Sequence, residues 1–222
     1  MTAEQTHWSN EPGRWKAGLS PEAWATIPRI QAPAVSPDGR LVAYVRGYDG
    51  RNDVWVVPTG GGLPVQLTDA VTPQGPDPNQ RQAMPLAWTP DSQTVVFAST
   101  GEGKLYRVPA AGGPSTRIEE AAGNHHSPAV SPDGARVAFV AERGETVDIF
   151  VASLDGTQLR HVSAADDDGY VANPRWSPDG DRIMWVRWPH YDMPWDETAI
   201  VVAGSTRGSA LVAADGERAS NN

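Results

Sequence analysis

Cysteine is absent from this 222-residue chain. The absence excludes disulfide bonds, thiolate metal sites and a cysteine nucleophile, but it does not distinguish the cytoplasm from the periplasm. Long apolar runs are also missing, since no stretch approaches the roughly 18 residues that a membrane-spanning helix needs. The first ten residues, MTAEQTHWSN, contain neither the basic nor the apolar region of a secretory signal. We therefore expect a soluble, cytoplasmic protein with no membrane partner.

Basic residues are scarce relative to acidic ones. The chain has 18 Lys and Arg residues against 27 Asp and Glu residues, which gives a formal net charge of −9. No run of Lys or Arg forms a local exception. Because nucleic acids and anionic membranes repel a surface of this charge, we expect neither as a partner.

A four-residue phrase of the type Ser-Pro-Asp-Gly recurs four times, with starts separated by 53, 42 and 46 residues. Each copy suits a type I turn, because Ser or Thr opens it, Pro presets φ at the second position and Gly favours the fourth. A recurrence of about 40–50 residues matches one four-stranded propeller blade. The copies are Ser36–Gly39, Thr89–Ser92, Ser131–Gly134 and Ser177–Gly180.

Each phrase lies between a short strand and an apolar strand that carries one aromatic residue at a fixed place. A third strand and a more polar fourth strand follow. The second strands are nearly continuous in apolar residues, which predicts that neighbouring blades cover both of their faces. These strands are expected at 41–45, 95–98, 137–140 and 183–186, with Tyr44, Phe97, Phe139 and Trp185 as their aromatic residues.

The repeat predicts an all-β fold, a β-propeller of about four blades, each a four-stranded antiparallel sheet, as an incomplete portion of a larger propeller. A β-sandwich is the alternative, but it gives no reason for one turn sequence to recur at blade spacing. Exposed blade faces or edges predict self-association. The predicted domains are an N-terminal extension with a short helix (1–30), blades at 31–69, 84–119, 127–163 and 172–212, and a polar tail (213–222).

Several acidic and histidine motifs invite a metal-site interpretation. Four equivalent turn aspartates indicate a structural role. Adjacent His125 and His126 point in different directions on an extended chain, so a solvated or inter-blade loop is favoured over zinc binding. Asp166–Gly169 lacks the alternating spacing of a calcium loop, so a solvated turn is favoured there. We expect neither a metal ion nor a cofactor.

An insert at Trp188–Thr198 lengthens the connection between the second and third strands of the fourth repeat. Two interpretations stay open. Either the insert faces a channel mouth or a second domain and contacts a peptide, or Trp188 and the other apolar residues of the insert staple a long loop onto the blade. The candidate contact residues are His190, Asp192, Trp195, Asp196 and Glu197.

The repeat resembles the TolB-like, WD-type propeller repeat. The insert resembles the HPNMPWDGTEL segment of prolyl-oligopeptidase-family serine peptidases, especially those of the acylaminoacyl-peptidase and dipeptidyl-aminopeptidase branch. Two other segments, Leu19–Glu22 and Pro174–Gly180, also resemble sequences typical of this family. The resemblance runs from about Leu19 to Ala203. The chain departs from the family at Tyr191, Asp192, Glu197 and Ala199, so the role of the family's Glu at the last position does not carry over.

This resemblance implies a non-catalytic propeller that restricts or guides peptide access to a C-terminal α/β-hydrolase domain with the catalytic triad. The chain lacks the G-x-S-x-G nucleophile elbow, and the nearest string, Gly204–Gly208, has Thr at the nucleophile position. We therefore expect no catalytic residue and no peptide hydrolysis by the chain alone. The alternative is a stand-alone TolB-like propeller that binds proteins or ligands. A sugar-active propeller is a third reading, but no acid pair outside the turns supports it.

Overall fold

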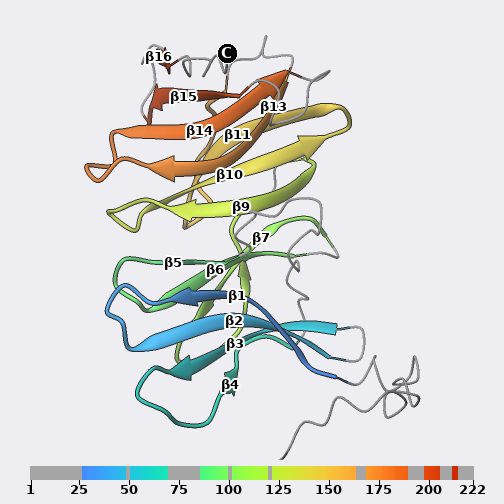
Figure 1. Ribbon diagram of the computed structural model, residues 1–222, viewed down its shortest axis with the longest axis vertical. Helices are drawn as coiled ribbons and strands as arrows, with labels where there is room; N and C mark the ends of the chain where they lie inside the picture. The colour runs from blue at the N-terminus through green and yellow to red at the C-terminus, as the bar shows by residue number, and fades with distance from the viewer. Residues whose placement is uncertain are drawn as a thin grey trace, which may run out of the picture.

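The computed structural model describes residues 27–48, 51–69, 86–99, 102–119, 122–163, 169–189 and 198–205, and the backbone of 212–214. Within these ranges the regular elements are all β-strands, grouped in four antiparallel sheets of four strands (Figure 1). Strands that follow one another in the chain are neighbours in each sheet. The predicted all-β fold with four-stranded blades is confirmed, whereas the helix predicted within residues 1–30 lies outside the described residues.

The four sheets are named blades 1 to 4. Blade 1 contains β1 (Arg29–Val35), β2 (Leu41–Tyr48), β3 (Arg51–Pro58) and β4 (Val65–Gln66). Blade 2 contains β5 (Leu86–Trp88), β6 (Thr94–Ala98), β7 (Leu105–Pro109) and β8 (Thr116–Arg117). Blade 3 contains β9 (Asn124–Val130), β10 (Arg136–Arg143), β11 (Thr146–Ser153) and β12 (Leu159–His161). Blade 4 contains β13 (Gly169–Trp176), β14 (Arg182–Pro189), β15 (Ala199–Gly204) and β16 (Val212–Ala214).

Many strands are longer than their apolar segments. The β10–β11 pairing, for example, continues without interruption from Arg136↔Ser153 to Arg143↔Thr146. Backbone hydrogen bonds do not depend on side-chain polarity, so the ladder extends into polar hairpin ends. For the same reason β9 and β13 begin three residues before the predicted blade boundaries, and β16 reaches into the segment predicted as a tail.

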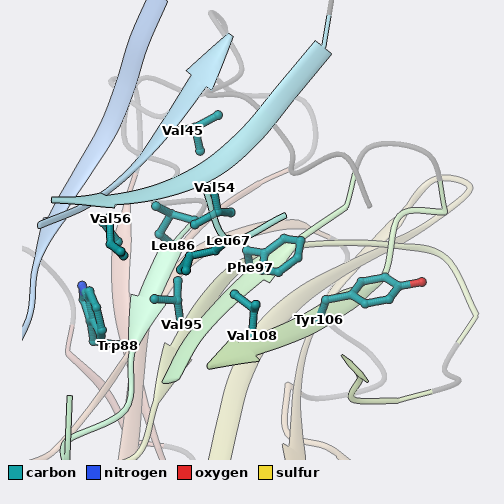
Figure 2. Close-up of a cluster of buried hydrophobic side chains, with 11 residues drawn as sticks. Val45, Val54, Val56, Leu67, Leu86, Trp88, Val95, Phe97, Tyr106 and Val108 are labelled. Atoms are coloured by element: carbon teal, nitrogen blue, oxygen red, sulfur yellow. The ribbon is translucent and has the colours of Figure 1, made fainter. Parts of the chain in front are cut away.

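Each blade packs face to face on the next one in chain order. Blades 1 and 2 share an apolar cluster that includes Val45, Val56, Trp88 and Phe97 (Figure 2). Equivalent clusters join blade 2 to blade 3 and blade 3 to blade 4. Blades 1 and 4 lie at opposite ends of the molecule (Figure 1). The four sheets therefore form an open stack.

Burial on both faces is confirmed for the second strands of blades 2 and 3, but it is wrong for blade 4. Ile183 and Trp185 of β14 are fully buried, whereas Met184 between them is 39% exposed. The buried pair faces blade 3, and Met184 faces away from it. Among the described residues, blade 4 has a neighbouring sheet on one side alone, so β14 alternates in burial although its sequence is continuously apolar.

The repeated turn is stabilised by the same three side-chain contacts in every copy. In the first, the Ser36 hydroxyl donates to Asp38 Oδ1 over 2.6 Å and accepts the Leu41 amide at 2.9 Å. Asp38 Oδ1 also accepts the Arg40 amide at 3.0 Å. These hydrogen bonds, that from Ser36 foremost, lower the pKa of Asp38. The other three copies form equivalent contacts.

A fifth turn of this kind lies between β11 and β12. Ser153 accepts the Gln158 amide at 2.9 Å, and Asp155 accepts the Thr157 amide at 3.0 Å. The sequence there is Ser-Leu-Asp-Gly, so the proline is not needed for the contacts. The aspartate and hydroxyl therefore define the turn.

The repeated turns also contact one another across blades. The Asp38 amide of blade 1 donates to the Ser92 hydroxyl of blade 2 over 3.1 Å. A Cβ on Gly134 would lie 3.3 Å from Pro90 Cδ, and one on Gly180 would lie 3.6 Å from Pro132 Cδ. The turns thus form one continuous end of the stack, called here the turn rim. The opposite end, with the connections between second and third strands, is called the hairpin rim.

Replacement of Gly156 by alanine tests how closely adjacent blades approach. Gly156 has φ +79°, and an added Cβ would overlap the Ile118 carbonyl oxygen of blade 2. We expect Gly156→Ala to lower the free energy of unfolding by about 1–2 kcal/mol, because alanine is strained in the left-handed conformation, and by about 1–3 kcal/mol more because of the overlap. Gly39→Ala is the matched control, with φ +73° and nothing within 4 Å of the added Cβ. Urea unfolding that gives equal losses for both variants would contradict this packing.

The Asp155 turn predicts a specific loss of stability in acid. Hydrogen bonds from Ser153 and Thr157 lower the pKa of Asp155 to about 2, against about 3.9 in an unfolded chain. Because the folded pKa is the lower one, the carboxylate stabilises the fold above about pH 4, and this contribution disappears as the pH falls toward 2. In urea unfolding, the difference in free energy of unfolding between wild type and Asp155→Asn should decrease as the pH falls from 5 to 2. A gap that does not change with pH would refute this role.

Candidate functional site

The insert lies on the hairpin rim between β14, which ends at Pro189, and β15, which begins at Ala199. Its predicted contact residues, His190, Asp192, Trp195, Asp196 and Glu197, lie outside the described residues. The start of the insert is described, however. Trp188 pairs with Tyr170 across the sheet, and their rings stack with centroids 5.7 Å apart. Trp188 therefore anchors the beginning of the insert on β13.

Blade 3 carries the two adjacent histidines, and the prediction of a solvated loop is wrong for them. His125 and His126 are buried residues of β9, at its hairpin-rim end. Their side chains point to opposite faces of the sheet, as expected for neighbours in a strand. His125 contacts Glu119 at the end of blade 2, so the inter-blade position is correct.

His125 and Glu119 form a buried polar pair. The distance from Nδ1 to Glu119 Oε1 is 2.6 Å, and the side chains are 0% and 2% exposed. The second ring nitrogen lies 3.2 Å from the Ala122 carbonyl oxygen. Both ring nitrogens thus face acceptors, which an imidazolium satisfies and a neutral ring satisfies on one side alone. The Phe139 ring, 4.8 Å away between centroids, completes the packing.

His126 takes part in a separate Ser-His-carboxylate set on the face toward blade 4. Its Nδ1 lies 3.0 Å from Ser127 Oγ, and its Nε2 lies 3.2 Å from Glu142 Oε1. Such a set suggests an activated serine. The Ser127 side chain is buried, however, so a substrate carbonyl has no access to it. The set therefore organises the rim and does not supply a nucleophile.

A second set of this kind contains His161, Asp148 and Ser163. His161 Nε2 faces both Asp148 Oδ1 and Ser163 Oγ at 3.0 Å, so a single nitrogen serves both contacts. The Ser163 hydroxyl accepts the Ile149 amide, as Thr68 accepts the Val54 amide in blade 1. Burial raises the pKa of Asp148, but hydrogen bonds from Arg143 and His161 outweigh it and lower the pKa overall. The repetition indicates a structural cap at the end of the blade.

The string nearest to a nucleophile elbow has a structural role in the part that is described. Ser205 is buried, donates to the Gly180 carbonyl over 2.8 Å and accepts from Arg136 Nη1 at 3.1 Å. These contacts tie blade 4 to blade 3 on the turn rim. Among the described residues, no three His, Asp or Glu side chains are grouped to hold a metal ion.

The strained residues of the first strands were not predicted. Ala32, Ser127 and Asn173 have φ of +50°, +53° and +54°, and each lies at a register shift in its strand. Each stands four residues before the first turn residue, and each precedes a proline, a signal visible in the sequence. β-Bulges of this kind bend a strand and redirect its side chains, and they are frequent beside functional sites.

The model of the TolB beta propeller domain family matches residues 79–194, more than half of the chain. The chain belongs to this family. Over 165 residues it is 27% identical to an uncharacterized protein of Agrobacterium fabrum, covering 69% of this chain and 53% of that one. Over 111 residues it is 31% identical to a TolB homolog of Chlorobium chlorochromatii, covering 50% of this chain and 23% of the homolog. The TolB-family chain thus spans about half of the first relative and a quarter of the second.

Solved structures similar to this TolB-family chain include a peptidase and a TolB protein. A puromycin-hydrolyzing peptidase of Mycobacterium tuberculosis matches with a TM-score of 0.67 and 25% identity, over 84% of this chain and 30% of the peptidase. TolB from Acinetobacter baumannii matches with a TM-score of 0.63 and 16% identity, over 85% of this chain and 44% of TolB. The second match shows the fold alone. In the described part of the chain, no helix is long and apolar enough to cross a membrane.

Truncation of Glu119 tests the buried pair. Glu119→Ala leaves His125 without its partner inside the protein, and we expect a loss of about 3–5 kcal/mol in the free energy of unfolding. Glu142→Ala removes the partner of His126 in a matched way, but the Glu142 side chain is 38% exposed. That variant should lose no more than about 1 kcal/mol. Similar losses for the two variants in urea unfolding would show that burial does not govern these pairs.

Proposed function

We propose that this chain is the propeller portion of a prolyl-oligopeptidase-like serine peptidase and that it restricts or guides peptide access to a hydrolase domain outside this sequence. The observation that carries the proposal is the insert at Trp188–Thr198, with its Met193–Asp196 core and its position on the hairpin rim. The structural similarity to a puromycin-hydrolyzing peptidase also supports the proposed relation to peptidases.

The chemistry of the insert suits short peptides. Asp192, Asp196 and Glu197 place three carboxylates in one connection, and the chain as a whole has a net charge of −9. Such a rim attracts the positively charged amino terminus of a peptide. His190 and Trp195 add a hydrogen-bonding ring and a large apolar surface for its side chains. The described blades are closely packed and cannot yield to a folded protein, which supports selection of peptides by size.

A stand-alone TolB-like module that binds proteins is the second candidate. The observation in its favour is the match to the Chlorobium TolB homolog. It predicts binding of a folded partner, with no preference for short peptides. A catalytic domain in the same gene would not be expected.

Peptide binding to the insert can be measured by NMR titration of the 222-residue chain with a short peptide. We expect the affinity for a peptide with a free amino terminus to fall several-fold when the peptide is acetylated or when the chain carries Asp196→Asn and Glu197→Gln. Asp155→Asn on the turn rim is the control, because it removes one carboxylate from the opposite end. The chain should not cleave chromogenic aminoacyl or prolyl substrates. Equal affinities for both peptides and all variants would reject the insert as a peptide site.

The sequence of the gene beyond codon 222 separates the two candidates. A downstream segment with a G-x-S-x-G elbow would support the peptidase proposal. A gene without such a segment would reject it and favour the binding module. Peptide turnover by the 222-residue chain itself would overturn the prediction that it contains no catalytic residues.

A further inference from the structure

We propose that Arg136 and Arg160 of blade 3 form a binding site for a phosphate group on the turn rim, where blade 3 meets blade 4. The ligand is either inorganic phosphate or the phosphate of a phosphorylated small molecule, since both present the same oxygens to the protein. The site lies at the opposite end of the blades from the insert, and the proposal does not rest on the peptidase assignment.

Arg136 is held in place by contacts with both blades. Its guanidinium lies over the Trp176 ring, with Cζ 4.7 Å from the ring centroid. Nη1 donates to the Ser205 hydroxyl over 3.1 Å, and Nη2 donates to the Gly180 carbonyl over 3.1 Å. Nη2 also lies 3.2 Å from Asp133 Oδ2, so this positive charge has a carboxylate partner. The contacts fix one guanidinium at the junction of the two blades.

Arg160 brings a second guanidinium to the same place. It pairs with Val151 in the β11–β12 ladder, and its Nη2 donates to the Gly204 carbonyl over 3.1 Å. Gly204 directly precedes Ser205, which Arg136 contacts, so the two arginines bind consecutive residues at the end of β15. In the sheet, β11 lies between the two strands that carry them. Their proximity therefore depends on the fold and not on a basic run in the sequence.

The charge of Arg160 is not compensated within the described part of the chain. The ion pairs there do not include Arg160, and the Gly204 carbonyl is its one hydrogen-bond acceptor among the described residues. Burial lowers the pKa of Arg160, and the neighbouring charge of Arg136 lowers it further. A guanidinium nevertheless stays protonated. Two positive charges thus share a partly buried position, and Asp133 pairs with one of them. Such an arrangement favours a bound anion.

A phosphate group suits this donor set better than a carboxylate does. At neutral pH a phosphate monoester carries a charge of about −1.5 to −2 and three acceptor oxygens, so it can accept from both guanidinium groups. The planar guanidinium fork also matches the spacing of phosphate oxygens. A carboxylate offers fewer oxygens and a smaller charge, which one arginine satisfies. The net charge of −9 opposes anions at long range, so we expect weak binding that decreases as salt is added.

NMR titration of the 222-residue chain with sodium phosphate at constant ionic strength tests the site. We expect saturable shifts of the Gly204 and Ser205 amide signals and of the Arg160 Nε signal. Arg160→Gln should weaken phosphate binding about tenfold, the equivalent of one charge-assisted hydrogen bond.

Arg182→Gln is the matched control for the loss of one positive charge. Arg182 stands at the same position of the repeated turn in blade 4 as Arg136 does in blade 3, and it is exposed. Because Ile183 faces blade 3, the side chain of Arg182 lies on the other face of β14. Arg182→Gln should change the phosphate affinity by less than about twofold.

Two further ligands identify what is bound. Adenosine monophosphate that binds as tightly as inorganic phosphate would assign the site to a phosphorylated molecule. Binding of inorganic phosphate without binding of adenosine monophosphate would assign it to the free ion. Sodium acetate should bind about tenfold more weakly than phosphate, because it makes fewer charge-assisted hydrogen bonds.

Urea unfolding provides a second measurement that also checks folding. A ligand that binds the native state alone raises the free energy of unfolding. At constant ionic strength, phosphate should raise the urea midpoint of the wild type and leave that of Arg160→Gln nearly unchanged. Arg160→Lys keeps the charge but lacks the planar fork, so its affinity for phosphate should lie between those of the other two.

Several outcomes would overturn the proposal. A titration without saturable shifts at Gly204 and Ser205 would reject the site. Equal weakening by Arg160→Gln and Arg182→Gln would show general attraction of anions to the surface. Acetate that binds as tightly as phosphate would reject phosphate as the ligand class. Loss of peptide binding to the insert, with phosphate binding intact, would contradict the proposed function and leave this inference standing.

Discussion

Face-to-face packing of successive sheets is the constraint on which the rest of this structure depends. Val96 and Phe97 of β6 are adjacent in sequence, but Phe97 packs on blade 1 and Val96 on blade 3. A strand that serves two interfaces must be apolar at nearly every position, which accounts for the unbroken hydrophobic segments of the sequence. Polar groups are consequently displaced to the ends of the strands. The polar contacts therefore lie on the turn rim and the hairpin rim, and they differ between the two.

The turn rim is uniform, because the same hydroxyl–carboxylate contacts recur in all blades and link one blade to the next. The hairpin rim differs from blade to blade. There the chain places the His125–Glu119 pair, the His126 set and the insert after Pro189. Variation of one rim on a uniform scaffold is how propellers acquire different functions. This asymmetry is the reason why the proposed peptide contact is placed on the hairpin rim.

The repeat spacing and the turn residues were sufficient to predict the fold from the sequence, because a four-residue turn forms from local contacts and recurs once per blade. The same reasoning failed at His125, because the partner Glu119 belongs to the preceding blade and burial depends on both. A turn at Asp155-Gly156 was predicted from its glycine, but the Ser-Pro-Asp-Gly phrase did not predict that this turn forms the same hydrogen bonds without the proline. The Gly204–Gly208 string was interpreted as a chance match to the nucleophile elbow, and the structural role of Ser205 became clear from Arg136 and Gly180, which are distant in the sequence.

Local sequence was thus enough to specify the strands, the turns and the count of four blades, because each depends on residues that are close together in the chain. It also supplied the family resemblance through the insert. Which face of each strand is covered could not be read from it, since Met184 and Val96 are equivalent apolar residues and differ in burial through the presence of a neighbouring sheet. The buried pairing of His125 with Glu119 likewise follows from the order in which whole sheets stack, a long-range property that no local pattern encodes.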